Sequence, residues 1–119
     1  AIFRTVGVEP HLYRPPHGKK SPWGLHCVKR ARLIAITWSA SSNDQLIKSP
    51  ELYARNIVNE VGPGKIVLLH DGYGIMHDCS LADQSLTVRA LPLIIESLRK
   101  QGYQFVTVSE LLGVPAYNN

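Results

Sequence analysis

The stretch that most constrains the fold is an apolar run that ends in His-Asp-Gly. Ile66 to Leu69 are four consecutive apolar residues, bounded by Gly64 and Gly72 and followed directly by His70. An uninterrupted Ile/Val/Leu run predicts a strand buried on both faces, as in parallel sheets covered by helices. Folds of this kind place their chemistry at the carboxyl ends of the strands. We therefore expect His70 to stand where a substrate binds.

The composition indicates one short domain of ordinary character. The chain has 119 residues, 45% of them hydrophobic and 18% charged, and no apolar run approaches the length of a membrane span. The net charge of +4 comes partly from basic runs at 19–20 and 29–32. We interpret these runs as solvated helix ends rather than a nucleic-acid site. The sequence begins at Ala1 without methionine, so we expect a processed product or a fragment.

The two cysteines form no metal-binding pattern. Cys27 lies in a predicted helix, where we expect a small core residue, and Cys79 lies in a predicted loop. Pairing of the two remains open at this stage.

Predicted strands and helices alternate along the chain. Ser21-Pro22 and Ser49-Pro50 each join a capping serine to a proline suited to the first helical position. The predicted strands are 11–13, 33–38, 66–69 and 103–108, and the main helices are 22–31, 50–61 and 84–100. Short helices are expected at 1–6 and 109–112, a connector at 8–10, loops at 39–48 and 71–83, and a frayed tail at 116–119.

Each main helix has a predicted apolar face. The predicted core residues are Trp23, Leu25 and Val28 in the first helix, Tyr53, Ile57 and Val61 in the second, and Leu91, Ile94, Ile95 and Leu98 in the third. Pro92 within the third helix predicts either a kink or a later start.

This alternation predicts a parallel sheet with crossover helices. The loops that follow strands hold Arg14, the segment 38–44 and His70. Because the carboxyl ends of parallel strands meet at one edge, we expect these loops to cluster there.

Several residues in these loops are suited to chemistry. His70 could act as a general acid, a general base or a metal ligand, or it could simply close a strand with a hydrogen bond. Asp44 could set the charge state of that histidine or be an ordinary loop residue. Arg14 could orient a carboxylate with two parallel hydrogen bonds. His17 follows two prolines in a stiff turn whose backbone N–H groups could bind a substrate oxygen.

Taken together, three segments resemble the polysaccharide deacetylases of the NodB-homology type, also called carbohydrate esterase family 4. Arg14-Pro15-Pro16-His17-Gly18 is similar to that family's third motif. The segment 38–44, from Trp38 to Asp44, is similar to its fourth, and Ile66 to His70 resembles its fifth, Leu-x-Leu-x-His. The motifs occur in the family's order, and the resemblance covers roughly residues 7–113.

The resemblance implies a fold and a division of the domain. The family fold is a distorted (β/α) barrel with about twice as many elements as this chain. Residues 1–119 are thus expected to form a single unit, the carboxyl-terminal half of such a domain, with about four parallel strands and three crossover helices in a partial barrel.

The resemblance also implies roles. In this family a divalent metal, typically zinc, activates a water that attacks an acetyl carbonyl, and an aspartate serves as base. Arg14 would orient that aspartate, His70 would protonate the leaving amine, and Asp44 would hold the His70 ring. The substrate-binding residues would be Pro16, His17, Trp38 and Leu68.

The chain departs from the family pattern in two ways. Gln45 stands where the family usually has tryptophan. The Thr-Phe-Asp-Asp-Gly and His-x-x-x-His motifs, which supply the base and the metal ligands, do not occur, so no metal ligand is assigned. We therefore expect the chain alone to be inactive. An open sheet edge would favour association with a second copy or with the missing half.

Three functions follow as hypotheses. The first is removal of N- or O-acetyl groups from a peptidoglycan- or chitin-like glycan, with a related possibility of acyl or formyl removal from a small amide. The second is a non-catalytic glycan- or protein-binding remnant of a deacetylase. The third is an unrelated doubly wound binding domain. The family usually works outside the membrane, which implies an extracellular or cell-wall location.

Overall fold

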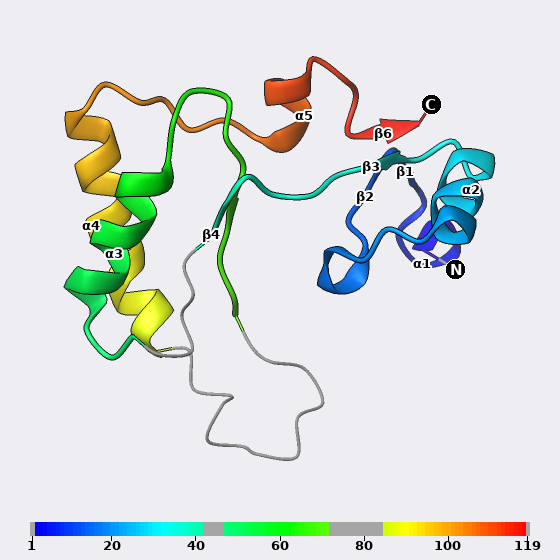
Figure 1. Ribbon diagram of the computed structural model, residues 1–119. Helices are drawn as coiled ribbons and strands as arrows, with labels where there is room; N and C mark the ends of the chain where they lie inside the picture. Colours follow the sequence, from blue (N-terminus) through cyan, green and yellow to red (C-terminus); the bar gives the residue numbers. More distant parts are fainter. Residues whose placement is uncertain (1, 42–46, 72–84, 119) are drawn as a thin grey trace. The chain divides into compact units, whose positions relative to one another are not determined.

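The structure, a computed structural model, describes residues 2–41, 47–71 and 85–118 (Figure 1). The chain divides into two compact units. Unit 1 comprises Ala1–Thr37 and Val106–Asn119, and unit 2 comprises Trp38–Phe105. Mixed α/β structure is present in both, and none of the described helices is long and apolar enough to cross a membrane.

The described residues of unit 1 form two short strand pairs and four short helical elements. In chain order these are α1 (Ile2–Val6), β1 (Glu9–Pro10), β2 (Leu12–Tyr13), η1 (Pro16–Gly18), α2 (Pro22–Arg30), β3 (Ile34–Ala35), α5 (Val108–Leu112) and β6 (Tyr117–Asn118). Strands β2 and β3 are parallel, with Leu12 opposite Ile34. The parallel pairing across α2 confirms one predicted crossover.

The antiparallel pair β1–β6 corrects two predictions, because 8–10 is not merely a connector and 116–119 not merely a frayed tail. Glu9 stands opposite Asn118 and Pro10 opposite Tyr117. The His11 ring supports the pair, since its Nδ1 lies 2.8 Å from the carbonyl oxygen of Pro115. A carbonyl only accepts, so Nδ1 carries the proton. These contacts join residues more than 100 positions apart, which local patterns do not reveal.

Helix α2 begins as predicted but buries less than predicted. The side chain of Ser21 caps the helix by accepting a hydrogen bond from the backbone N–H of Gly24 at 3.0 Å. No residue of α2 is buried, and Trp23 is 77% exposed. Leu25 is exposed and Val28 is half-buried. Cys27 is exposed and carries a free thiol, so its prediction as a core residue is wrong, and Cys79 lies outside the described residues.

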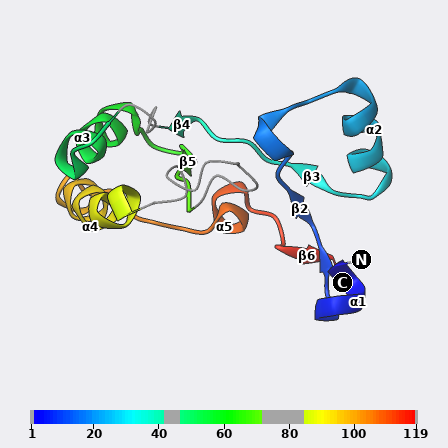
Figure 2. The same ribbon diagram turned by 90° about the horizontal axis from the view of Figure 1, so that it is seen from below.

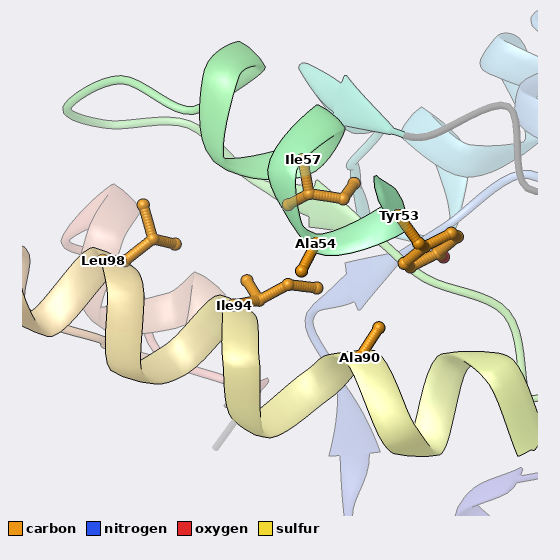
Figure 3. Close-up of a cluster of buried hydrophobic side chains, with 6 residues drawn as sticks. All are labelled: Tyr53, Ala54, Ile57, Ala90, Ile94 and Leu98. Carbon is orange, nitrogen blue, oxygen red and sulfur yellow. The ribbon is translucent and has the colours of Figure 1, made fainter. Parts of the chain in front are cut away.

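Unit 2 is built around two helices that lie side by side (Figures 1 and 2). The elements among its described residues are β4 (Ala40–Ser41), α3 (Pro50–Glu60), β5 (Val67–Leu68) and α4 (Ser85–Lys100). Figure 3 shows the core between the helices, where side chains of α3 face those of α4. The members of this core are Tyr53, Ala54 and Ile57 of α3 and Ala90, Ile94 and Leu98 of α4.

The apolar stripe of α3 is confirmed and that of α4 is corrected in part. Tyr53 and Ile57 are both 0% exposed, as their spacing of four predicts. On α4 the buried positions are Thr87, Ala90, Ile94 and Leu98, which recur every three or four residues. Leu91 and Ile95, which lie beside this stripe on the helix surface, are exposed and half-buried respectively. The described helix, Ser85–Lys100, continues through Pro92, and Gln84 lies outside the described residues.

The strands of unit 2 are shorter and less buried than predicted. Strand β4 falls within the predicted 39–48 loop, and it pairs in parallel with β5. Val67 and Leu69 are half-buried and pack against the helix core, so the α3–α4 pair covers one face of β5. The prediction that this strand is buried on both faces is therefore wrong for the described structure.

The predicted strand at 103–108 is also wrong, because residues 103–107 form neither strand nor helix. Tyr103 packs against the core, and Thr107 caps α5. Thr107 and Glu110 form a reciprocal capping box, which explains why the chain turns into a helix at this point. Instead of one four-stranded sheet, the described residues form three two-stranded pairs, two parallel and one antiparallel.

Candidate functional site

The turn after β2 holds three of the predicted site residues. Arg14, Pro16 and His17 are exposed, whereas Pro15 is buried and anchors the turn. The backbone N–H of Gly18 donates to the carbonyl of Pro15 at 3.0 Å, and that of Lys19 donates to Pro16 at 3.2 Å.

His17 has unusual backbone geometry within this turn. Its φ is 54° and its ψ is 18°, in the left-handed region that non-glycine residues seldom adopt. Flanking hydrogen bonds on either side hold this conformation, so the turn is a defined structure rather than a loose connection. The turn that the sequence predicts after the two prolines is present in the structure.

The second group of predicted residues belongs to unit 2. Ser41 of β4 stands opposite Leu68 of β5, and both strands run in the same direction. The backbone N–H of Ser39 donates to the carbonyl of Ile66 at 3.0 Å. Trp38, Leu68 and His70 are all half-buried. His70 follows Leu68 by two residues, so the chain carries it past the carboxyl end of the β4–β5 pair.

Ser39 is a contributor that the sequence patterns missed. Its hydroxyl oxygen accepts a hydrogen bond from the backbone N–H of Ile66 at 3.0 Å. This contact fastens the start of β4 to the strand that leads to His70. The two residues are 27 positions apart, and no local pattern marks the serine.

The predicted site residues are thus divided between the two units. Arg14, Pro16 and His17 share a turn in unit 1, and Leu68 and His70 share a strand end in unit 2. Asp44 lies outside the described residues, as does Gln45. Convergence of Arg14, Asp44 and His70 therefore stays a prediction.

The described residues do not fit the divalent metal that the resemblance implies. Within 2–41, 47–71 and 85–118, no group of three or more His, Cys, Asp or Glu side chains is arranged to hold a metal ion.

The sequence is similar to known polysaccharide deacetylases. The chain is 40% identical, over 113 residues, to a peptidoglycan-N-acetylglucosamine deacetylase from Bacillus cereus. The match covers 93% of this chain and 49% of that protein. No family model matches the sequence.

Solved structures agree in fold. A crystal structure of a peptidoglycan N-acetylglucosamine deacetylase in complex with 4-naphthalen-1-yl-N-oxidanyl-benzamide matches with a TM-score of 0.82 over 98% of this chain and 51% of that chain, at 24% identity. A family 4 acetyl xylan esterase from Clostridium thermocellum, in complex with a cobalt ion, matches with a TM-score of 0.73 at 32% identity, over 98% of this chain and 53% of that chain.

The curated relatives are peptidoglycan and chitooligosaccharide deacetylases, and the structural neighbours include an esterase of carbohydrate esterase family 4. These similarities confirm the resemblance to the NodB-homology polysaccharide deacetylases that the three motifs carry. The chain spans about half the length of the Bacillus cereus deacetylase and of a chitooligosaccharide deacetylase from Bradyrhizobium.

Proposed function

We propose that this chain forms part of a hydrolase that removes acetyl groups from an N-acetylated glycan of the peptidoglycan or chitin type. The observation that carries the proposal is the 40% identity to a peptidoglycan-N-acetylglucosamine deacetylase across 93% of the chain. The predicted acid, His70, also follows a strand end, where α/β enzymes carry their reactive groups.

In this reaction water adds to the acetyl carbonyl, the carbon–nitrogen bond breaks, and acetate leaves with a free amine on the sugar. His70 gives its proton to the departing nitrogen, because an amine leaves far more readily when it is protonated. Asp44 accepts a hydrogen bond from the other ring nitrogen and holds the imidazole in position. A backbone N–H at the His17 turn donates to the oxygen that becomes negative during attack.

Arg14 is a positioning residue in this proposal. Its planar guanidinium makes two parallel hydrogen bonds to a carboxylate and so fixes the orientation of the base. That base, and the ligands of zinc or another divalent metal, would be supplied by residues beyond those described here. Pro16, Trp38 and Leu68 would contact the sugar or the acetyl group. An extracellular or cell-wall location is part of the same proposal.

A chimeric protein tests the function. The 119-residue chain replaces the matching segment of the Bacillus cereus deacetylase, and acetate release from N-acetylglucosamine oligomers is measured. We expect the chimera to release acetate, the His70→Ala chimera to be slower by about 10²- to 10⁴-fold, and the chain alone to be inactive. The control is Arg55→Ala, an exposed residue of α3 in the same unit.

A chimera that folds, as judged by its circular dichroism, yet releases no acetate would contradict the proposal. If that chimera still bound the oligomers, the alternative of a non-catalytic glycan-binding remnant would replace the enzyme.

A further inference from the structure

One exposed face of α2 combines an aromatic ring with positive charge. Trp23, His26, Lys29 and Arg30 are all exposed, as are Leu25 and Cys27, while Gly24 and Val28 are half-buried. Trp23, His26 and Arg30 recur at intervals of three and four, so they line up along one side of the helix. At a rise of 1.5 Å per residue, the line from Trp23 to Arg30 is about 10.5 Å long. We call these four exposed residues the α2 face.

The charge around this face is one-sided. No acidic residue occurs between Glu9 and Asp44, whereas this stretch holds six Lys and Arg residues. Unit 1 as a whole carries seven Lys and Arg residues against two acidic ones. One of those two, Glu110, uses its carboxylate to accept hydrogen bonds from Thr107 at 2.7 Å. Unit 2, by contrast, has six Lys and Arg residues and seven acidic ones. The net positive charge of the chain therefore resides in unit 1.

An exposed tryptophan beside cations fits a particular ligand chemistry. The indole presents a flat apolar surface that packs against the apolar face of a sugar ring. Arg30 and Lys29 make charge-assisted hydrogen bonds to carboxylates, and arginine does so with two parallel bonds. A neutral glycan would contact only the indole ring, whereas a carboxylate-bearing glycan would contact both the indole ring and the cations.

We propose that the α2 face binds a carboxylate-bearing acetylated glycan, namely the peptide-substituted strand of peptidoglycan. This inference rests on the proposed function and narrows its substrate from any N-acetylated glycan to an anionic one. Trp23 follows His17 by six positions, and both residues belong to unit 1. A strand held on the α2 face is thereby tethered to the unit that carries the predicted His17 turn.

The test is equilibrium binding of the 119-residue chain to three soluble probes of matched length. These are peptidoglycan strands with free carboxylates, the same strands with the carboxylates amidated, and neutral N-acetylglucosamine oligomers. We expect the free-carboxylate strands to bind about tenfold more tightly than either of the others, and that preference to fall in about 0.5 M salt.

Paired variants locate the site. K29E/R30E reverses two cations in the last turn of α2, and R99E/K100E reverses two cations in the last turn of α4. Both pairs are exposed, and both changes place two negative charges at the carboxyl end of a helix, so R99E/K100E controls for that general effect. We expect K29E/R30E to weaken binding of the free-carboxylate strands about tenfold and R99E/K100E to leave it unchanged. Trp23→Ala should weaken binding of all three probes.

Equal binding of the three probes, or equal loss in the two paired variants, would overturn the inference. A phosphate-bearing polymer that bound more tightly than the carboxylated strands would overturn it as well. The result is independent of the proposed reaction, because an active chimera can accompany a chain that shows no charge preference, and an inactive chimera can accompany one that does.

Discussion

Ser41 of β4 lies opposite Leu68 of β5, and the two strands run parallel. This register fixes which parts of the chain leave the pair at the same end. His70 follows Leu68 by two residues, and Asp44 follows Ser41 by three. The pairing is thus the structural relationship on which the proposed coupling of Asp44 to His70 depends.

The Ser39 hydroxyl contributes to this register. In Ser39→Ala the backbone N–H of Ile66 loses its partner at 3.0 Å, and we expect that amide to exchange with solvent faster. Hydrogen exchange followed by NMR checks this. The amide of Ile34, which donates to the carbonyl of His11 in unit 1, is the internal control and should keep its rate. An unchanged rate at Ile66 would show that the hydroxyl does not hold the strands.

The capping box of α5 predicts a pH dependence. Hydrogen bonds from the Thr107 side chain and backbone lower the pKa of Glu110 below its ordinary value of 4.5. A carboxyl whose folded pKa is lowered stabilises the fold above its unfolded pKa, and this contribution is lost as the pH falls through the folded pKa. Glu110→Gln should therefore lower the urea midpoint near about pH 7 and have a smaller effect near about pH 3.

The control for this prediction is Glu96→Gln on the exposed side of α4. Its effect on the urea midpoint should be small at both values of pH. If Glu110→Gln had the same effect on the midpoint at both, the ionised carboxylate would not be what stabilises the cap.

The core of unit 2 should depend on Ile57. This side chain is 0% exposed between α3 and α4, so Ile57→Ala leaves a cavity and should reduce the free energy of unfolding by about 2–5 kcal/mol. Leu52→Ala removes a side chain that is 38% exposed on the same helix and should cost less than half as much. Urea denaturation followed by circular dichroism measures both. Similar losses in the two variants would mean that the helix pair is not a packed core.

Local chemistry accounts for the parts of the fold that could be predicted. Ser21 and Ser49 cap helices because each accepts a hydrogen bond from a backbone N–H three residues ahead, and that signature is visible in the sequence. The capping box from Thr107 to Glu110 has an equally visible signature, Thr-x-x-Glu, which would have excluded a strand through residue 108. The pairing of β1 with β6 has no local signature, since its register is set by contacts between distant segments.

The sequence was enough to predict which residue types belong to the candidate site. It was not enough to predict how those residues are arranged in space. The turn at His17 and the strand that leads to His70 both form, because prolines and β-branched residues restrict the backbone locally. The exposure of α2 could not be predicted from the sequence. The spacing of apolar residues indicates which side of a helix could be buried, but it does not indicate whether another element covers that side.

The coupling of Asp44 to His70 tests the account most directly. In the chimera that carries this chain, kcat is measured for Asp44→Asn, His70→Ala and the double variant. Residues that act as one unit are not additive, so we expect the double variant to be no slower than the His70→Ala variant. Losses that multiply in the double variant, or a full rate in either single variant, would contradict the account.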